Sequence, residues 1–146
     1  MQITVTRQWL LAGKAICTVK SPKGGHYTYK VSKADDADRW FVSLLTGPDN
    51  TYNYTYLGML QLDTSMPATI RLTGASKLNA DSTPVKVAAW AFWHVLLDKP
   101  LPPGYSVDGE GRCGRCGRPL THPDGIANDG YRLGFGAKCW GKMMGE

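Results

Sequence analysis

Four residues near the C-terminus have the types and the order of a metal site. Cys113 and Cys116 form a Cys-x-x-Cys turn, in which two thiolates can converge on one ion and the neighbouring glycines permit a tight backbone. Structural zinc takes two further nitrogen or sulfur ligands, and Cys139 and His122 are the candidates. Asp124 is a reserve ligand, because carboxylates rarely enter such sites. The sequence therefore predicts a structural Zn²⁺ site made by Cys113, Cys116, His122 and Cys139.

Two further residues have metal-binding side chains but stand in apolar surroundings. Cys17 lies in a strand-like run, where a free cysteine commonly acts as a small buried hydrophobe. His94 lies in an apolar helical segment, which favours a packed core imidazole. For the Cys113–Cys116 pair, the alternatives to zinc are a redox-active dithiol and unliganded thiols.

The segment 105–146 contains few large aliphatic residues, so burial of apolar surface alone would hardly order it. Zinc ligation contributes about 10–16 kcal/mol in small modules and would supply the missing stabilisation. Four filled ligand positions leave no open position for an activated water. We therefore expect the metal to be structural and not catalytic.

The composition is that of a folded globular protein. Of the 146 residues, 42% are hydrophobic, which is enough for a core and well above a disordered composition. Seventeen Lys and Arg against twelve Asp and Glu give a formal net charge of +5. This mild excess fits an anionic partner, and it also fits ordinary solubility. No dense basic arm of a dedicated nucleic-acid tail is visible.

The first eighty residues predict short strands joined by turns. The apolar residues alternate with polar ones, as in Tyr27, Tyr29 and Val31, and turn-forming clusters at 21–25 and 47–50 separate the runs. The expected strands, within about 14–72, are 14–19, 27–31, 40–45, 52–60 and a further one at 70–72. Consecutive strands with short turns indicate an antiparallel meander.

An apolar helix is expected over about 83–97. Ser82 or Thr83 can cap it, and Pro84 suits its first turn. A helix that is apolar over most of its circumference is largely buried, so we expect it to pack across the sheet. The predicted fold class is α+β: an antiparallel meander of four or five strands packed on one buried helix, with a C-terminal zinc knuckle like a treble clef. The predicted domains are an α+β domain over 1–100 and a zinc-binding knuckle over 101–146.

Neither a secretory signal nor an apolar stretch of the roughly 18–20 residues that span a bilayer is visible. We therefore expect the protein in a reducing cytosol, with no membrane partner. In that compartment a Cys pair more often binds metal than forms a disulfide.

Several segments resemble a small uncharacterised family encoded largely by bacteriophages and other mobile elements. The resemblance rests on the motif Cys-Gly-Arg-Cys-Gly-Arg from Cys113 and the Gly-x-Gly-x-x-Cys that ends at Cys139. The segments 41–50 and 54–58 and the helix 84–97 also look like that family, so the resemblance covers most of the chain. It implies a zinc knuckle or treble clef, with the last Cys opening a short helix, and a host bacterial cytosol. It implies no activity.

The first functional hypothesis is a non-enzymatic protein that binds nucleic acid. Basic groups around the knuckle can contact phosphates, and an exposed aromatic can stack on bases. The candidate contacts to nucleic acid or another partner are Arg112, Arg115, Arg118, Arg132, Lys138 and Trp140. The alternative is that the arginines only stabilise the thiolates of the metal site.

A second hypothesis follows from the phage-like resemblance: an inhibitor that binds and blocks a host defence or regulatory protein. Tyr52, Tyr54, Tyr56 and Trp9 are its candidate interface anchors, although alternating tyrosines commonly just cover sheet surface. The sequence does not favour catalysis, because the acidic run 35–38 has the pattern of a solvated face and the Gly-rich 23–26 lacks the spacing of a phosphate loop.

Overall fold

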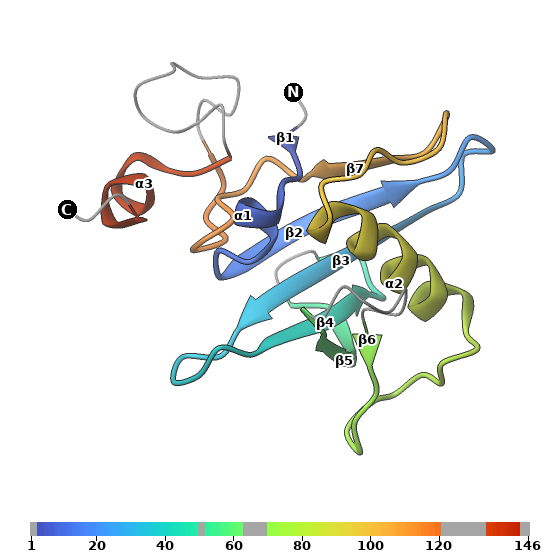
Figure 1. Cartoon of the computed structure of the whole chain (residues 1–146). Helices are drawn as coiled ribbons and strands as arrows, with labels where there is room; N and C mark the ends of the chain where they lie inside the picture. Colours follow the sequence, from blue (N-terminus) through green and yellow to red (C-terminus); the bar gives the residue numbers. More distant parts are fainter. Residues whose placement is uncertain (1–2, 50–51, 63–69, 121–133, 144–146) are drawn as a thin grey trace.

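A single antiparallel sheet organises the chain (Figure 1). The computed structural model describes residues 3–49, 52–62, 70–120 and 134–143. The strands are β1 (Ile3–Thr4), β2 (Lys14–Lys20), β3 (His26–Lys33), β4 (Trp40–Leu45), β5 (Tyr54–Leu60), β6 (Ile70–Arg71) and β7 (Ser106–Gly109), and the helices are α1 (Arg7–Leu10), α2 (Thr83–Leu96) and α3 (Ala137–Met143). The strand order across the sheet is β1-β7-β2-β3-β4-β5-β6.

From β2 to β6, each strand pairs with the next one along the chain. The alternation in the sequence places one set of side chains on one face, where Cys17 lies opposite Tyr29 and Tyr29 opposite Leu44. Gly24 has a φ of 90°, which only glycine adopts without strain, and it closes the β2–β3 turn. A register shift between Val42 and Ser43 interrupts the pairing of β4 with β5.

Helix α2 lies across the face that these residues form (Figure 1). Ser82 is its N-cap and Pro84 stands in its first turn, where the missing N–H removes no helical bond. The buried stripe along the helix is Val85, Ala88, Ala91, Phe92 and Leu96. The Tyr29 hydroxyl donates to the Pro84 carbonyl (2.6 Å), and its ring meets Phe92 edge-on at 5.5 Å. These contacts fix the start of α2 over the middle of the sheet.

A second set of contacts holds the N-terminal segment against the sheet. The Thr6 hydroxyl accepts from the Trp9 N–H and caps α1. The Trp40 indole N–H donates to the Leu11 carbonyl (2.9 Å), and the Arg7 guanidinium donates to the Leu96 carbonyl (3.2 Å) at the end of α2. Trp9 is completely buried. Residues before the first long strand therefore form part of the core.

The α+β class, the antiparallel sheet and the cysteine cluster near the C-terminus are confirmed. Four or five strands and one helix are too few, since the described residues contain seven strands and three helices. The added elements are short: β1 has two residues, α1 has four, and β7 reads Ser-Val-Asp-Gly. Segments of this length carry no periodicity, so only their partners in the folded chain define them.

Replacement of Phe92 by Ala should lower the free energy of unfolding by about 3–5 kcal/mol, because it opens a cavity under α2 and removes the edge contact with Tyr29. Urea unfolding followed by circular dichroism measures the change. The matched control is Tyr52→Ala, whose side chain is 80% exposed and whose loss should change stability by less than about 0.5 kcal/mol. Equal effects of the two substitutions would contradict the placement of α2.

Candidate metal centre

The Cys-x-x-Cys turn follows β7, which is a strand of the sheet. This strand pairs with β1 on one side and with β2 on the other, and the Glu110 N–H continues this pairing by donating to the Ile16 carbonyl (3.1 Å). The chain then leaves the sheet and turns back on itself through a bridge between Arg112 and Pro119. The turn therefore starts from a fixed point on the sheet.

Within this turn, backbone hydrogen bonds fix the positions of the two cysteines. The Cys113 N–H donates to the Arg118 carbonyl (2.9 Å), and the Gly117 N–H donates to the Cys113 carbonyl (2.8 Å). Gly117 has a φ of 77°, so the residue after Cys116 must adopt a left-handed conformation that favours glycine. Glycine at position 117 of the Cys-Gly-Arg-Cys-Gly-Arg motif thus has a structural role: it allows the chain to turn back tightly after Cys116.

Trp9 joins this turn to the segment that carries the third cysteine. Its indole N–H donates to the Gly134 carbonyl (2.9 Å), across 125 positions of sequence. The Gly114 N–H donates to the same carbonyl (2.9 Å), while the Gly114 carbonyl accepts from the Lys14 N–H (2.8 Å) at the start of β2. Both glycines lie so close to Trp9 that an added Cβ would fall about 2.5–2.6 Å from the indole ring. The indole therefore sets the spacing of the two segments.

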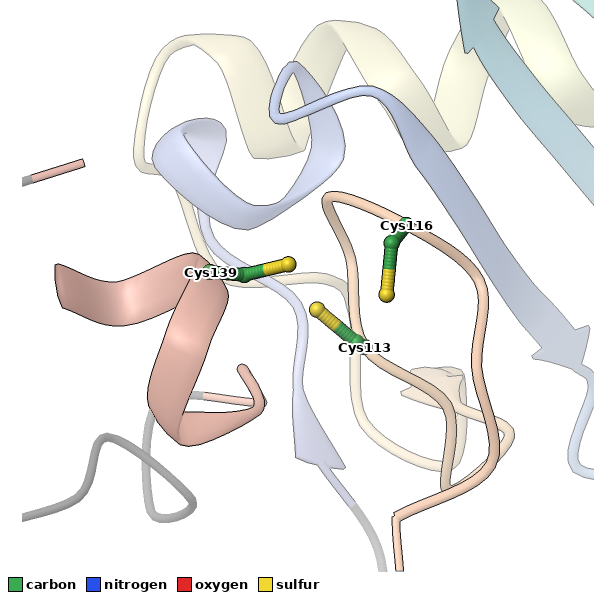
Figure 2. Close-up of side chains that lie close together, drawn as sticks. All are labelled: Cys113, Cys116 and Cys139. Atoms are coloured by element: carbon green, nitrogen blue, oxygen red, sulfur yellow. The ribbon is translucent and has the colours of Figure 1, made fainter. Parts of the chain in front are cut away.

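The three cysteines meet at this junction (Figure 2). Cys139 projects from α3 toward Cys113 and Cys116, and the three sulfur atoms all lie within 4.8 Å of one another. Two thiolates on one tetrahedral zinc, each at about 2.3 Å, stand about 3.8 Å apart, so the cluster needs only a small contraction to hold an ion. Cys113 and Cys139 are buried and Cys116 is exposed. The three cysteines lie close enough to bind a metal ion.

Arg115 provides the positive charge at the cluster. Burial acts to raise the pKa of the Cys139 thiol, but hydrogen bonds from Arg115 and from the other two thiols outweigh it and bring the pKa below its usual value. The Arg115 guanidinium lies 3.5 Å from the Cys139 sulfur. A thiolate is the metal-binding form of cysteine, so this arrangement favours a ligand at position 139.

Cys113 differs from Cys139 in its surroundings. Burial raises the pKa of the Cys113 thiol, and backbone N–H groups of Gly136, Cys116 and Arg115 oppose that rise. Backbone amides directed at a buried sulfur stabilise its negative charge without any side-chain cation. The backbone amides of both segments thus reduce the effect of burial on this thiol, but burial is the larger influence and its pKa stays above the usual value.

The other residues that the sequence analysis considered fall into two groups. Cys17 is fully buried in β2, where burial raises its thiol pKa, and His94 bonds through Nδ1 to the Trp90 carbonyl in α2; neither belongs to the cluster. His122 and Asp124 lie outside the described residues, as does Arg132. The fourth ligand therefore remains a prediction from the sequence.

The predicted partner contacts take different positions. Arg112 donates to the Gly117 carbonyl (2.8 Å), so it braces the turn, and Arg115 contacts the Cys139 sulfur. Arg118 and Lys138 are exposed. Trp140 is half-buried and stacks on Phe135, with ring centroids 5.9 Å apart. Of the six, Arg118 and Lys138 are the described residues that present charge to the solvent.

Sequence reasoning missed the part that Trp9 plays in the site. It treated Trp9 as a candidate interface anchor, but its side chain has 0% exposure, and it packs against the cysteine turn. The signal available in the sequence was weak: glycines at 114 and 134 next to metal-binding motifs indicate a close approach without naming the approaching group.

Comparison with known proteins adds no relative: no family model, no curated protein and no solved structure matches this chain. Among the helices of the described ranges, none combines the length and the apolar character needed to cross a bilayer.

Replacement of Cys139 by Ser should remove most of the bound metal, because a hydroxyl is a poor substitute for the thiolate that α3 brings to the cluster. Elemental analysis of the purified protein should find about one metal ion per chain in the wild type and well under half of that in the variant. The matched control is Cys17→Ala, which removes a cysteine outside the cluster and should leave the metal content unchanged. Full metal content in the Cys139→Ser variant would exclude this residue as a ligand.

Replacement of Gly134 by Ala should loosen the attachment of α3 to the sheet. The new Cβ would lie 2.5 Å from the Trp9 Nε1 and 2.6 Å from an Ile3 methyl, at a φ of 83° that an L side chain rarely adopts. We expect a loss of about 2–4 kcal/mol in unfolding free energy and faster transfer of the metal to a chelating dye. Gly74→Ala is the control, since its Cβ would meet nothing within 4 Å and should change neither property. The placement of Trp9 would be wrong if both variants behaved like the wild type.

Proposed function

We propose that this protein is a non-enzymatic, zinc-binding accessory protein of bacteriophage type that binds nucleic acid through the surface around its metal centre. The observation that carries the proposal is the convergence of Cys113, Cys116 and Cys139, with exposed cations within two positions of two of these cysteines in sequence: Arg118 after Cys116 and Lys138 before Cys139.

Zinc fits the donor set. Three thiolates prefer a soft or borderline ion, and Zn²⁺ completes a tetrahedral site with a nitrogen ligand. We assign His122 as that fourth ligand, which would make a Cys₃His site. Arg115 and the backbone N–H groups at Cys113 offset the negative charge of such a site, and no described acidic residue belongs to the cluster. When bound, zinc supplies cross-linking stabilisation and no open coordination position.

A structural role for the ion agrees with the packing of the tail. Among the described residues after β7, the fully or largely buried side chains are Cys113, Phe135 and Cys139, and two of the three belong to the cysteine cluster. Leu120, Trp140 and Met143 add only partly buried contacts with the core. A metal bond between the turn and α3 supplies the cohesion that so few apolar side chains do not.

The binding surface that we propose consists of Arg118 and Lys138, with Lys142 at the end of α3. All three side chains are exposed, and none of them forms an ion pair among the described residues. The other two arginines of the turn have contacts within the protein: Arg112 donates to the Gly117 carbonyl, and Arg115 contacts the Cys139 sulfur. Phosphate contacts from the exposed set would add a sequence-independent attraction to nucleic acid. The formal net charge of +5 acts in the same direction.

The second candidate function is the inhibitor of a host defence or regulatory protein. One observation favours it: Tyr52, in the β4–β5 connection, is 80% exposed, and a large exposed aromatic is a common anchor of protein interfaces. Tyr54 and Tyr56 are half-buried, and the Tyr56 ring meets Phe41 edge-on, so they are poorer anchors. The two functions differ in which surface is used.

The double variant Arg118→Gln, Lys138→Gln should weaken binding to a labelled single-stranded oligonucleotide. Removal of each phosphate contact should lower the slope of log affinity against log salt by about 0.7, and the affinity at low salt should fall at least tenfold. Fluorescence anisotropy over a salt series measures both quantities. The double variant Arg39→Gln, Lys77→Gln removes the same charge from exposed sites elsewhere and should change the slope much less.

Two results would contradict the nucleic-acid function. One is the absence of binding to single- or double-stranded DNA and RNA at low salt by zinc-loaded protein. The other is a stoichiometric host protein that co-purifies, survives nuclease treatment and is lost on Tyr52→Ala, which would favour the inhibitor.

A further inference from the structure

A pocket lies at the end of the sheet away from the cysteines. The β2–β3 turn, the first half of α2 and the chain entering β7 enclose a cavity of about 410 Å³. This volume is at the lower end of the range for ligand pockets, so it suits a small molecule better than a peptide. In Figure 1 the β2–β3 turn and the chain before β7 lie side by side at one end of the sheet, and α3 lies beyond the other.

The walls of the pocket are mainly aromatic and aliphatic. Trp90 of α2 makes edge-on contacts with two rings, Tyr105 and His94, each with its centroid 5.1 Å from that of Trp90. Tyr27 of β3 and Val19 of β2 line the side formed by the sheet. Rings held in this way present fixed flat surfaces, against which a planar aromatic ligand can stack without reordering the protein.

The charged side chains of the pocket are both basic: Lys20 at the end of β2 and Lys86 in the first turns of α2. His26 at the start of β3 also lines it, and the lining contains no acidic residue. Neither Lys20 nor Lys86 takes part in an ion pair among the residues that the structure describes. Thr83 also lines the pocket, so the first turn of α2 borders it. The N-terminal end of a helix carries a partial positive charge, and the first turn of α2 contains no acidic side chain. The cavity therefore combines flat apolar walls with a positive rim.

Gly104 holds the aromatic wall in place. It has a φ of 87°, and an added Cβ would lie 2.7 Å from the Pro22 ring in the β2–β3 turn. The Tyr105 N–H donates to the Pro102 carbonyl (3.1 Å), which closes the turn just before the ring. Tyr105 is 40% exposed although it is large and contacts Trp90, as expected of a side chain at the mouth of a binding pocket.

From these observations we propose that the pocket binds a nucleoside monophosphate: the base stacks on the face of one of the two rings, Trp90 or Tyr105, and meets the other edge-on, and the phosphate lies between Lys20 and Lys86. This site is distinct from the cysteine cluster and does not rest on the function proposed above. The same chemistry occurs in a free nucleotide and in the terminal nucleotide of a strand.

Calorimetric titration of the intact, metal-loaded protein with AMP, adenosine and inorganic phosphate tests the proposal. AMP should bind with a dissociation constant in the submillimolar range, and adenosine and phosphate should each bind at least about fivefold more weakly, because each supplies only half of the recognised groups. A 5′-phosphorylated trinucleotide in a parallel titration identifies the source: tighter binding than AMP indicates the end of a strand, and equal or weaker binding indicates the free nucleotide.

Variants locate the site. Lys20→Gln and Lys86→Gln should each weaken AMP binding about fivefold without changing adenosine binding, and Tyr105→Ala should weaken both by at least about fivefold. Lys77→Gln is the matched control, because this lysine is exposed outside the pocket. Gly104→Ala should weaken AMP binding through the displacement of Tyr105 while leaving the metal content unchanged.

Two results would overturn the proposal. One is the absence of AMP binding at up to about 5 mM by protein whose circular dichroism shows it to be folded. The other is AMP binding that is unaffected by the lysine and Tyr105 variants, which would place the ligand elsewhere.

Discussion

The contact of the Trp9 indole with Gly114 and Gly134 is the constraint on which the C-terminal third of the structure depends. The ring comes from α1, near the start of the chain, and its N–H reaches a carbonyl just before α3. With the indole in place, the cysteine turn is held to β2 through Gly114, and α3 is held to that turn through Gly134. Three contacts thus fix the distance between Cys139 and the other two cysteines: the hydrogen bond of Gly114 to β2, the hydrogen bond between Gly114 and Gly134, and the packing of the Trp9 ring on both glycines.

This constraint explains why a metal centre can form in a segment with few apolar side chains. A bound ion stabilises a fold most when its ligands are already close, because less chain entropy is then lost on binding. Here the backbone positions Cys113, and the Arg115 guanidinium stands against Cys139. The three arginines therefore differ in role, although they recur at every third position. Arg112 hydrogen-bonds to the Gly117 carbonyl in the turn, Arg115 places its positive charge beside the Cys139 sulfur, and Arg118 faces solvent.

The sequence predicted the parts of the fold that have strong local signals. Strand β4 begins and ends at the residues expected from its apolar run, and α2 begins at Thr83, where a polar cluster and a proline precede an apolar segment. The Cys-x-x-Cys motif and Cys139 were found because few other arrangements of cysteines are chemically as specific. What escaped prediction has no local signal. Ser-Val-Asp-Gly becomes β7 only because the edge of β2 is available to it, and the burial of Trp9 depends on glycines more than a hundred positions away.

The place of β7 in the sheet has a consequence for how the chain is made. β1 and β2 leave the ribosome well before β7, yet both pair with it, because β7 follows them in the chain only after α2. Until then β2 presents an open edge, and such an edge can pair with another nascent chain. Completion of the sheet is therefore delayed until β7 has been synthesised, and long-range closure of this kind is slow. A hairpin of β2 and β3 can form early, but β1 and β7 become native together.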